Sequence, residues 1–325
     1  MATYQYSLQA FPRANCPPYA ALSYVWGTSA PSARLGLDSG EIPITPELRA
    51  ILDRIAGTPS LLEPAWLWID AICINQADIQ EKSVQIPKMG EIYNGALTVT
   101  IWLGDADKAT TDAIQGIEDF RFLMALTSTA PVPGTIPDAN DPMWKAAEEL
   151  FCRPWFGRAW VAQEVLLARK CRVVFGQRVI PWEVILRYWA YMELGRHDFV
   201  VSQRHRIGHD TISPFDMILA ASSAKGGERW SSVINQNNLE WAFRPQYHVV
   251  GLLDLIRRRA CKEGHDKAYS LLGLLPEEIR SKIPIRPATR QRGEAKEMLR
   301  FLESHGAYLG VLLTLAGGVD RNGTR

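Results

Sequence analysis

AWLWIDAICI, residues 65–74, is the stretch of this sequence that says most about its fold. Apart from Asp70 it carries no charge, and it is apolar on both faces of an extended chain. Such a run is typical of a strand that is buried on both sides in a parallel sheet. Further apolar runs at 20–27, 97–103 and 171–175 predict three more strands.

Helices are predicted between these strands. Ile44 to Ala56 has Thr45 as a cap, Pro46 in the first turn and a glycine after its end. A second helix is expected to begin after Asp78 and run to about residue 93, with a disturbance at Pro87. The alternation of strand and helix predicts an α/β fold with a parallel sheet.

The character of the sequence changes after about residue 180, where apolar helical patterns alternate with polar loops. We therefore predict two regions: an α/β domain over residues 1–178, and a mostly helical C-terminal region over residues 179–325 that packs on it.

Composition excludes several function classes. The chain has 325 residues, 36 Lys plus Arg against 35 Asp plus Glu, and a net charge of +1, so it offers no basic face for nucleic acid or an anionic membrane. Its five cysteines are scattered, with no C-x-x-C pair, which is typical of reduced thiols inside a cell. With no apolar signal segment at the start, a cytoplasmic location is expected.

Ligands of open α/β sheets bind outside the carboxyl ends of the strands. The residues at or near the ends of the first two predicted strands are therefore candidate binding residues: Tyr24, Trp26, Gly27, Asp70, Asn75 and Gln76. Asp70 has an equally good structural interpretation, as a carboxylate that accepts backbone N–H groups. Asn75 and Gln76 could form no more than a turn before the next helix.

Glu164 is the sharpest candidate. Its helical neighbours three and four positions away are Trp160, Val161, Leu167 and Ala168, so no cation is available on its own helix. An acid on an apolar, aromatic face is typical of a site with a shifted pKa. The competing interpretation is an ion pair with Arg158 or Arg153. Gln163 has similar neighbours, and the helix is expected to offer both polar side chains at one place.

Four ordered blocks together resemble the fungal heterokaryon incompatibility (HET) domain. They are ALSYVWG (21–27), LWIDAICINQ (67–76), EKSVQIPKMGEIYNGALTVTIWLG (81–104) and RPWFGRAWVAQE (153–164), and DKAYSLLGL (266–274) resembles a segment that commonly follows the domain. The resemblance implies a protein of self/non-self recognition that triggers cell death when unlike hyphae fuse. It also implies a flavodoxin-like sheet, distantly similar to Toll/interleukin-receptor (TIR) domains.

Several TIR domains hydrolyse NAD with a glutamate on a helix after the third strand, which implies a catalytic role for Glu164. Tyr24, Trp26 and Trp160 would then stack on nicotinamide or adenine, and Asp70, Asn75, Gln76 and Gln163 would bind polar groups of this substrate. No metal and no resident cofactor are expected. An activating protein partner and a homo-oligomer are expected. The alternative is a non-enzymatic signalling module that self-associates.

Overall fold

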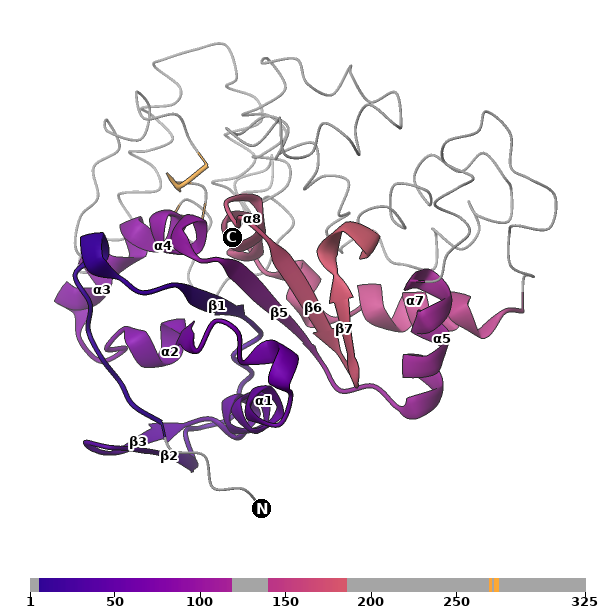
Figure 1. Ribbon diagram of the computed structural model, residues 1–325, viewed down its shortest axis with the longest axis horizontal. Coiled ribbons are helices and arrows are strands. Elements are labelled where there is room, and N and C mark those ends of the chain that lie inside the picture. Colours follow the sequence, from indigo (N-terminus) through magenta and orange to yellow (C-terminus); the bar gives the residue numbers. More distant parts are fainter. Residues whose placement is uncertain (1–5, 119–139, 186–268, 271, 275–325) are drawn as a thin grey trace, which may run out of the picture.

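The computed structural model describes residues 6–118, 140–185, 269–270 and 272–274 (Figure 1). Most of the helical region predicted for residues 179–325 lies outside the described residues. Among the described helices, none is both long enough and apolar enough to cross a membrane.

A five-stranded sheet forms the centre of the described part. Its spatial order is β4-β1-β5-β6-β7, in which the first four strands are parallel and β7 is antiparallel to β6. Numbered along the chain within this sheet, the order is 2-1-3-4-5, which is the flavodoxin pattern. The predicted α/β class and the adjacency of the four predicted strands are confirmed. The strands are β1 (Tyr19–Ser23), β4 (Trp66–Trp68), β5 (Thr98–Gly104), β6 (Cys171–Phe175) and β7 (Arg178–Pro181).

Helices flank this sheet, as Figure 1 shows. The predicted break at Pro87 is confirmed, because a 3-10 turn over Ile86–Lys88 separates two helices there. The helices are α1 (Pro46–Ala56), α2 (Asp70–Cys73), α3 (Ile79–Gln85), α4 (Met89–Gly95), α5 (Lys108–Glu118), α7 (Pro142–Phe151) and α8 (Val161–Leu166).

The prediction of one strand over the whole of residues 65–74 is wrong. The strand β4 ends at Trp68, and the one-turn helix α2 begins at Asp70. The side chain of Asp70 accepts the N–H of Ala71, which favours the turn, and Ala71 and Ile72 pack against the buried core. In the one-turn helix these apolar residues are half-buried against the core.

A short antiparallel hairpin was not predicted. Its strands are β2 (Ala33–Leu37) and β3 (Gly40–Ile44), and they form a separate two-stranded sheet. Only Leu35 and Ile44 of the hairpin are buried, and both join the main core cluster. The sequence lacks a strong alternating pattern here because so few of its residues face the core.

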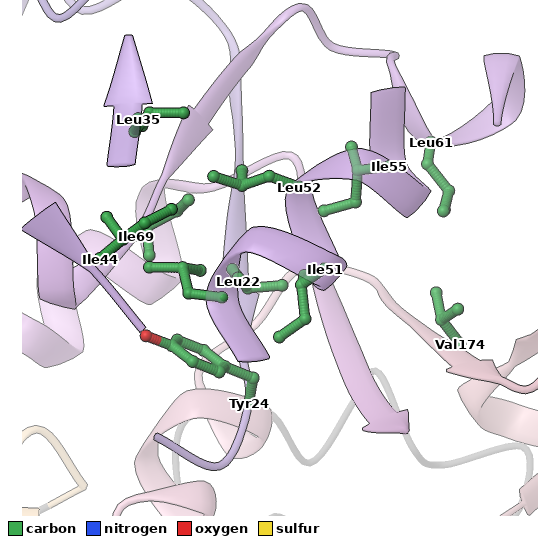
Figure 2. Close-up of a cluster of buried hydrophobic side chains, with 11 residues drawn as sticks. Leu22, Tyr24, Leu35, Ile44, Ile51, Leu52, Ile55, Leu61, Ile69 and Val174 are labelled. Atoms are coloured by element: carbon green, nitrogen blue, oxygen red, sulfur yellow. The ribbon is translucent and has the colours of Figure 1, made fainter. Parts of the chain in front are cut away.

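The helix α1 covers one face of the sheet through its apolar stripe. Leu48, Ile51, Leu52 and Ile55 are all buried and meet Leu22 of β1. Figure 2 shows this cluster, with Tyr24 at its edge. Thr45 caps the helix by accepting the N–H of Leu48 at 3.2 Å. This packing fixes the carboxyl end of β1, from which the candidate site is built.

Candidate functional site

The candidate site begins where β1 ends. Ser23 is the last residue of that strand, and Tyr24, Trp26 and Gly27 follow it in a loop. In a sheet of this order the connections from β1 and from its neighbour β5 leave to opposite faces, which opens a place for a ligand beside the end of β1.

Trp26 and Asp70 meet directly. The indole N–H of Trp26 donates to one carboxylate oxygen of Asp70 at 2.9 Å, and the N–H of Ala71 donates to the other at 2.7 Å. Burial raises the pKa of Asp70 to about 6, against the lowering effect of Arg158, and the charge of Glu164 raises it further. Both Trp26 and Asp70 remain partly exposed. They can therefore meet a ligand from solvent.

Glu164 lies deeper, and its side chain is only 1% exposed. The hydroxyl of Ser23 donates to Oε2 of Glu164, and the buried indole of Trp155 donates to the same hydroxyl at 2.8 Å. This chain of donors ends on the carboxylate and ties α8 to the end of β1. A buried carboxylate needs such donors, because removing its water shell costs several kcal/mol.

Arg158 supplies the positive charge next to Glu164. Its guanidinium lies 3.4 and 3.5 Å from the two carboxylate oxygens, and its side chain is 18% exposed. Charge-assisted contacts of this kind are usually about 2.7–2.9 Å, so this ion pair is a long one. Burial lowers the pKa of Arg158, but the carboxylates of Glu164 and Asp70 outweigh burial and raise it.

The ion pair settles one of the sequence alternatives. Arg158 is the cation beside Glu164, whereas Arg153 pairs with Glu149 and donates to the carbonyl of Asp105. The position of Arg158, six residues before Glu164, lies outside the helical spacings that the sequence pattern tests.

Two tyrosines close the protein side of the site. Tyr24 is 2% exposed and packs in the core cluster (Figure 2), and burial, followed by the charge of Asp70, raises its pKa well above the usual value. Tyr93 of α4 is also buried, and its hydroxyl donates to the carbonyl of Leu22 at 3.1 Å. Burial and the charge of Glu164 raise the pKa of Tyr93 as well. Both tyrosine side chains are therefore uncharged and line the buried side of the site.

Gly27 allows a third acid, Glu47, to approach the loop. It has a φ of +73°, and a Cβ at this position would lie 3.2 Å from the carboxylate carbon of Glu47. The hydroxyl of Ser29 donates to Glu47, and this hydrogen bond lowers the pKa of the carboxyl. The sequence analysis missed Glu47, because an acid in the first turn of a helix is ordinary.

Asn75 and Gln76 form the turn that was the alternative to ligand binding. The side-chain oxygen of Asn75 accepts the N–H of Ala77, and the amide of Gln76 donates to the carbonyl of Asp70 at 2.9 Å. Gln76 thus braces the turn that holds Asp70, while Asn75 is exposed beside it.

Gln163 and Glu164 have separate partners. Gln163 accepts the N–H of Gly273 at 3.3 Å and lies against Gly90, whereas Glu164 meets Ser23 and Arg158. The expectation that both side chains serve one place therefore does not fit this arrangement. Trp160, directly before α8, is half-buried and uses its carbonyl to accept the N–H of Glu164.

The structure thus joins Trp26, Asp70 and Glu164 in one electrostatic cluster around Arg158. Ser23 was missed by the sequence analysis, and its only signal was a polar residue in a buried strand. Among the described residues, no group of three or more His, Cys, Asp or Glu side chains is placed to hold a metal ion.

A comparison with known protein families finds a match that spans the four sequence blocks. The sequence model of the family described as "Heterokaryon incompatibility protein (HET)" matches residues 19–164. A curated relative, "Heterokaryon incompatibility protein 6, OR allele" of Neurospora crassa, is 29% identical over 212 residues, which cover 54% of this chain and 31% of the relative. The chain therefore spans about a third of that relative's length. No solved structure matches.

Proposed function

We propose that this chain, whose residues 19–164 match the heterokaryon incompatibility (HET) family, acts in fungal self/non-self recognition and triggers cell death. We further propose that its domain does so by cleaving the nicotinamide–ribose bond of NAD in the cytoplasm. An activating protein partner and self-association belong to the same proposal.

One observation carries the chemical part of the proposal. Two carboxylates, Asp70 and Glu164, act on a single cation, Arg158, at the carboxyl end of β1. Burying charge is costly, and well-packed apolar side chains of similar size would often stabilise a protein as well or better. Buried charges with shifted pKa values gather at functional sites more than elsewhere. The cluster also lies at the edge of the sheet where ligands of such folds bind.

The chemistry matches these groups. Breaking the nicotinamide–ribose bond leaves its electron pair on nicotinamide and positive charge on the ribose carbon, to which water then adds with loss of a proton to solvent. A fixed carboxylate stabilises that charge, as carboxylates do in glycoside hydrolysis. Nicotinamide is a good leaving group, so no strong general acid is needed. Glu164 would stabilise the charge, Asp70 would bind a hydroxyl or amide, and the exposed part of the Trp26 ring would stack on a flat base.

Arg158 has to release Glu164 for this reaction. The pair is long, at 3.4 and 3.5 Å, and the side chain of Arg158 is 18% exposed, so this contact is the one that an entering ligand would most readily replace. A ligand that enters beside Arg158 would take over part of this contact. The developing positive charge would then replace the guanidinium next to Glu164.

A second candidate function is a non-enzymatic signalling module. The observation in its favour is that Glu164 is 1% exposed and both of its oxygens have partners. A structural ion pair would have the same features. In that case the domain would act by self-association, and the cluster would only stabilise α8 against the sheet.

NAD consumption by the purified full chain, dilute and crowded, tests the two candidates. We compare the wild type with Glu164→Gln, which keeps the size of the side chain and removes its charge. Glu41→Gln, at an exposed position of β3, is the matched control. Thermal melts of all three proteins show whether any loss of activity follows a loss of folded protein.

Catalysis predicts that Glu164→Gln loses NAD turnover, and toxicity in fungal cells, while Glu41→Gln keeps both. The loss should fall on turnover rather than on NAD binding. A folded Glu164→Gln protein with unchanged turnover would remove the catalytic assignment. A wild type that kills cells without consuming NAD would establish the signalling module instead.

A further inference from the structure

A distant part of the chain is buried against the domain. The described residues of 269–274, which we name the distal segment, come after β7 and beyond residues 186–268 in the sequence. Ser270, Leu272 and Leu274 are 0%, 1% and 6% exposed. Figure 1 shows the segment in orange beside α4 and near α8. The match to the HET family ends at residue 164, well before this segment.

The contact is a close approach of two backbones. A Cβ built on Gly90 of α4 would lie 2.9 Å from the Cα of Gly273, and a Cβ on Gly273 would lie 3.0 Å from the Cα of Gly90. Real Cβ atoms essentially never lie as close as 2.9 Å to another heavy atom, and 3.0 Å is tighter than nearly all of their contacts. Glycine at both positions is therefore what allows the segment to lie on α4.

The same segment holds α8 through Gln163. This side chain is 1% exposed, and its oxygen accepts the N–H of Gly273 at 3.3 Å. Its amide nitrogen is buried and has no hydrogen-bond partner within the described part of the chain. Leu167 completes the contact, because its Cδ1 would lie 2.9 Å from a Cβ on Gly90 or on Gly273.

The helix α8 depends on such contacts for its position. It has only six residues, and a helix this short has little stability of its own in water. Its Gln163 faces α4 and the distal segment, while its Glu164 reaches Ser23 at the end of β1. A displacement of α8 on one side therefore moves the carboxylate on the other.

We infer that the surface of α4 and α8 is the docking site of the distal segment, and that this docking positions Glu164 in the buried cluster. The HET domain is thus completed by a segment of its own chain from outside the matched region. The distal segment is thereby linked, through α8, to the candidate site. The inference holds whether or not the domain cleaves NAD.

The test uses Gly273→Ala in the full chain, since the added methyl has to push the segment away from Gly90, Gln163 and Leu167. Gly36→Ala is the matched control, because a Cβ on Gly36 meets nothing within 4 Å. Hydrogen exchange followed by mass spectrometry reports α4, α8 and the β2–β3 hairpin separately. We expect exchange in α4 and α8 to rise by about tenfold or more in Gly273→Ala, with the hairpin unchanged and Gly36→Ala like the wild type.

A second readout separates positioning from local packing. The carboxyl of Asp70 titrates under the influence of Arg158 and Glu164, so its midpoint reports where these two groups lie. Carboxyl NMR signals, assigned with Asp70→Asn, should show a shifted midpoint of Asp70 in Gly273→Ala.

If Gly273→Ala does not fold, Gln163→Met decides by the same two readouts. It keeps the length of the side chain and removes the acceptor for the N–H of Gly273, together with an amide nitrogen that has no hydrogen-bond partner within the described part of the chain. The inference is overturned if exchange in α8 and the midpoint of Asp70 both match the wild type in the folded variant. Faster exchange without a shifted midpoint would show packing alone and would equally overturn the positioning of Glu164.

Discussion

Ser23 connects the buried indole of Trp155 to the carboxylate of Glu164. It accepts the N–H of Trp155 at 2.8 Å and donates to Glu164, and all three side chains are at most 1% exposed. We predict that Ser23→Ala lowers the free energy of unfolding by about 1–3 kcal/mol, because it leaves a buried indole donor unsatisfied. Chemical denaturation at pH 7 measures this loss.

Thr98→Val is the comparison that makes the Ser23 result specific. Thr98, at the start of β5, is 7% exposed, and its hydroxyl is buried without a hydrogen-bond partner in the described part of the chain. Valine has the same branched shape and removes no contact, so the free energy of unfolding should stay equal or rise. Equal losses in the two variants would contradict the donor chain.

Asp70 gives a prediction with a defined sign in pH. Its folded pKa of about 6 lies above the ordinary value of 3.8, so between these values the folded protein holds the proton more firmly than the unfolded chain. Proton binding by Asp70 therefore adds to the free energy of unfolding. This contribution is complete below about pH 4 and is lost as the pH rises through about 6. Asparagine does not titrate. The wild type should therefore exceed Asp70→Asn in stability by more at pH 4.5 than at pH 7.

The comparison at pH 7 also has an expected direction. Both oxygens of Asp70 accept N–H groups, from Trp26 and from Ala71, and asparagine can offer only one oxygen. Asp70→Asn should thus be less stable than the wild type even at pH 7, by about 1–3 kcal/mol. Urea unfolding at pH 4.5 and pH 7 measures the difference in free energy of unfolding between the wild type and Asp70→Asn. If this difference is not smaller at pH 7 than at pH 4.5, the pKa of Asp70 is not raised in the folded protein.

Part of the site could be predicted at the scale of residues. The apolar neighbours of Glu164 on its helix are consistent with its buried position, and Trp26 and Asp70, which the rule for strand ends selected, are hydrogen-bonded to each other. Arg158 was one of two arginines that the sequence offered as a partner of Glu164, and spacing could not decide between them. Ser23 was not offered at all, because its contact depends on how the loop before α8 meets β1. Gln163 was misplaced for the same reason, since its partner Gly273 is 110 positions away.

At the scale of elements, the ends of strands were the least predictable feature. Hydrophobicity marks residues 65–74 as buried, but burial alone does not separate a strand from a one-turn helix. The turn at Asp70 depends on its hydrogen bond to the N–H of Ala71, which apolar patterning does not contain. The helix α1, with a cap, a proline and a regular stripe, was predicted almost to the residue.

The hairpin of β6 and β7 depends on one glycine. Gly176 lies in the two-residue turn with a φ of +54°, and a Cβ there would lie 2.5 Å from the hydroxyl oxygen of Thr111 and 3.1 Å from Ala106. We predict that Gly176→Ala lowers the free energy of unfolding by about 2 kcal/mol or more, because alanine disfavours the left-handed backbone and its Cβ collides with Thr111. Thermal and urea unfolding measure the loss.

Gly36→Ala again serves as the control, since it lies in the strand β2 with open space around it. Alanine at this position should leave the stability unchanged or raise it slightly, because it restricts the unfolded chain. If both variants lost the same stability, the conformation of the turn would not be the cause.

At the scale of the whole molecule, the order of the sheet followed from the alternation of strands and helices, because parallel neighbours need crossover connections. Which parts of the chain complete the domain did not follow. The strands β6 and β7 lie beyond residue 164, where the family match ends, and the distal segment lies further still. Sequence similarity marks where the family is recognisable, which is a different boundary from the unit that folds.

This difference leads to a prediction about fragments. A fragment of residues 19–164 lacks β6, whose Val173, Val174 and Phe175 are 0% exposed, and it turns the central strand β5 into an edge. A fragment of residues 1–185 keeps the sheet but leaves the surface of α4 and α8 uncovered. Each fully buried leucine contributes about 1.5–3 kcal/mol, so the loss of Leu272 and Leu274 removes a large share of a typical stability of about 5–15 kcal/mol.

We therefore expect three distinct behaviours. The full chain should unfold cooperatively, residues 1–185 should keep secondary structure but melt at a lower temperature, and residues 19–164 should show no cooperative transition. Circular dichroism melts and limited proteolysis of the three proteins distinguish these outcomes, because proteolysis follows the population of open states. If a 19–164 fragment melts like the full chain, neither β6 nor the distal segment is needed for the stability of the domain. If a 1–185 fragment has the melting temperature of the full chain, the distal segment does not stabilise the domain, and the complete sheet is sufficient for its stability.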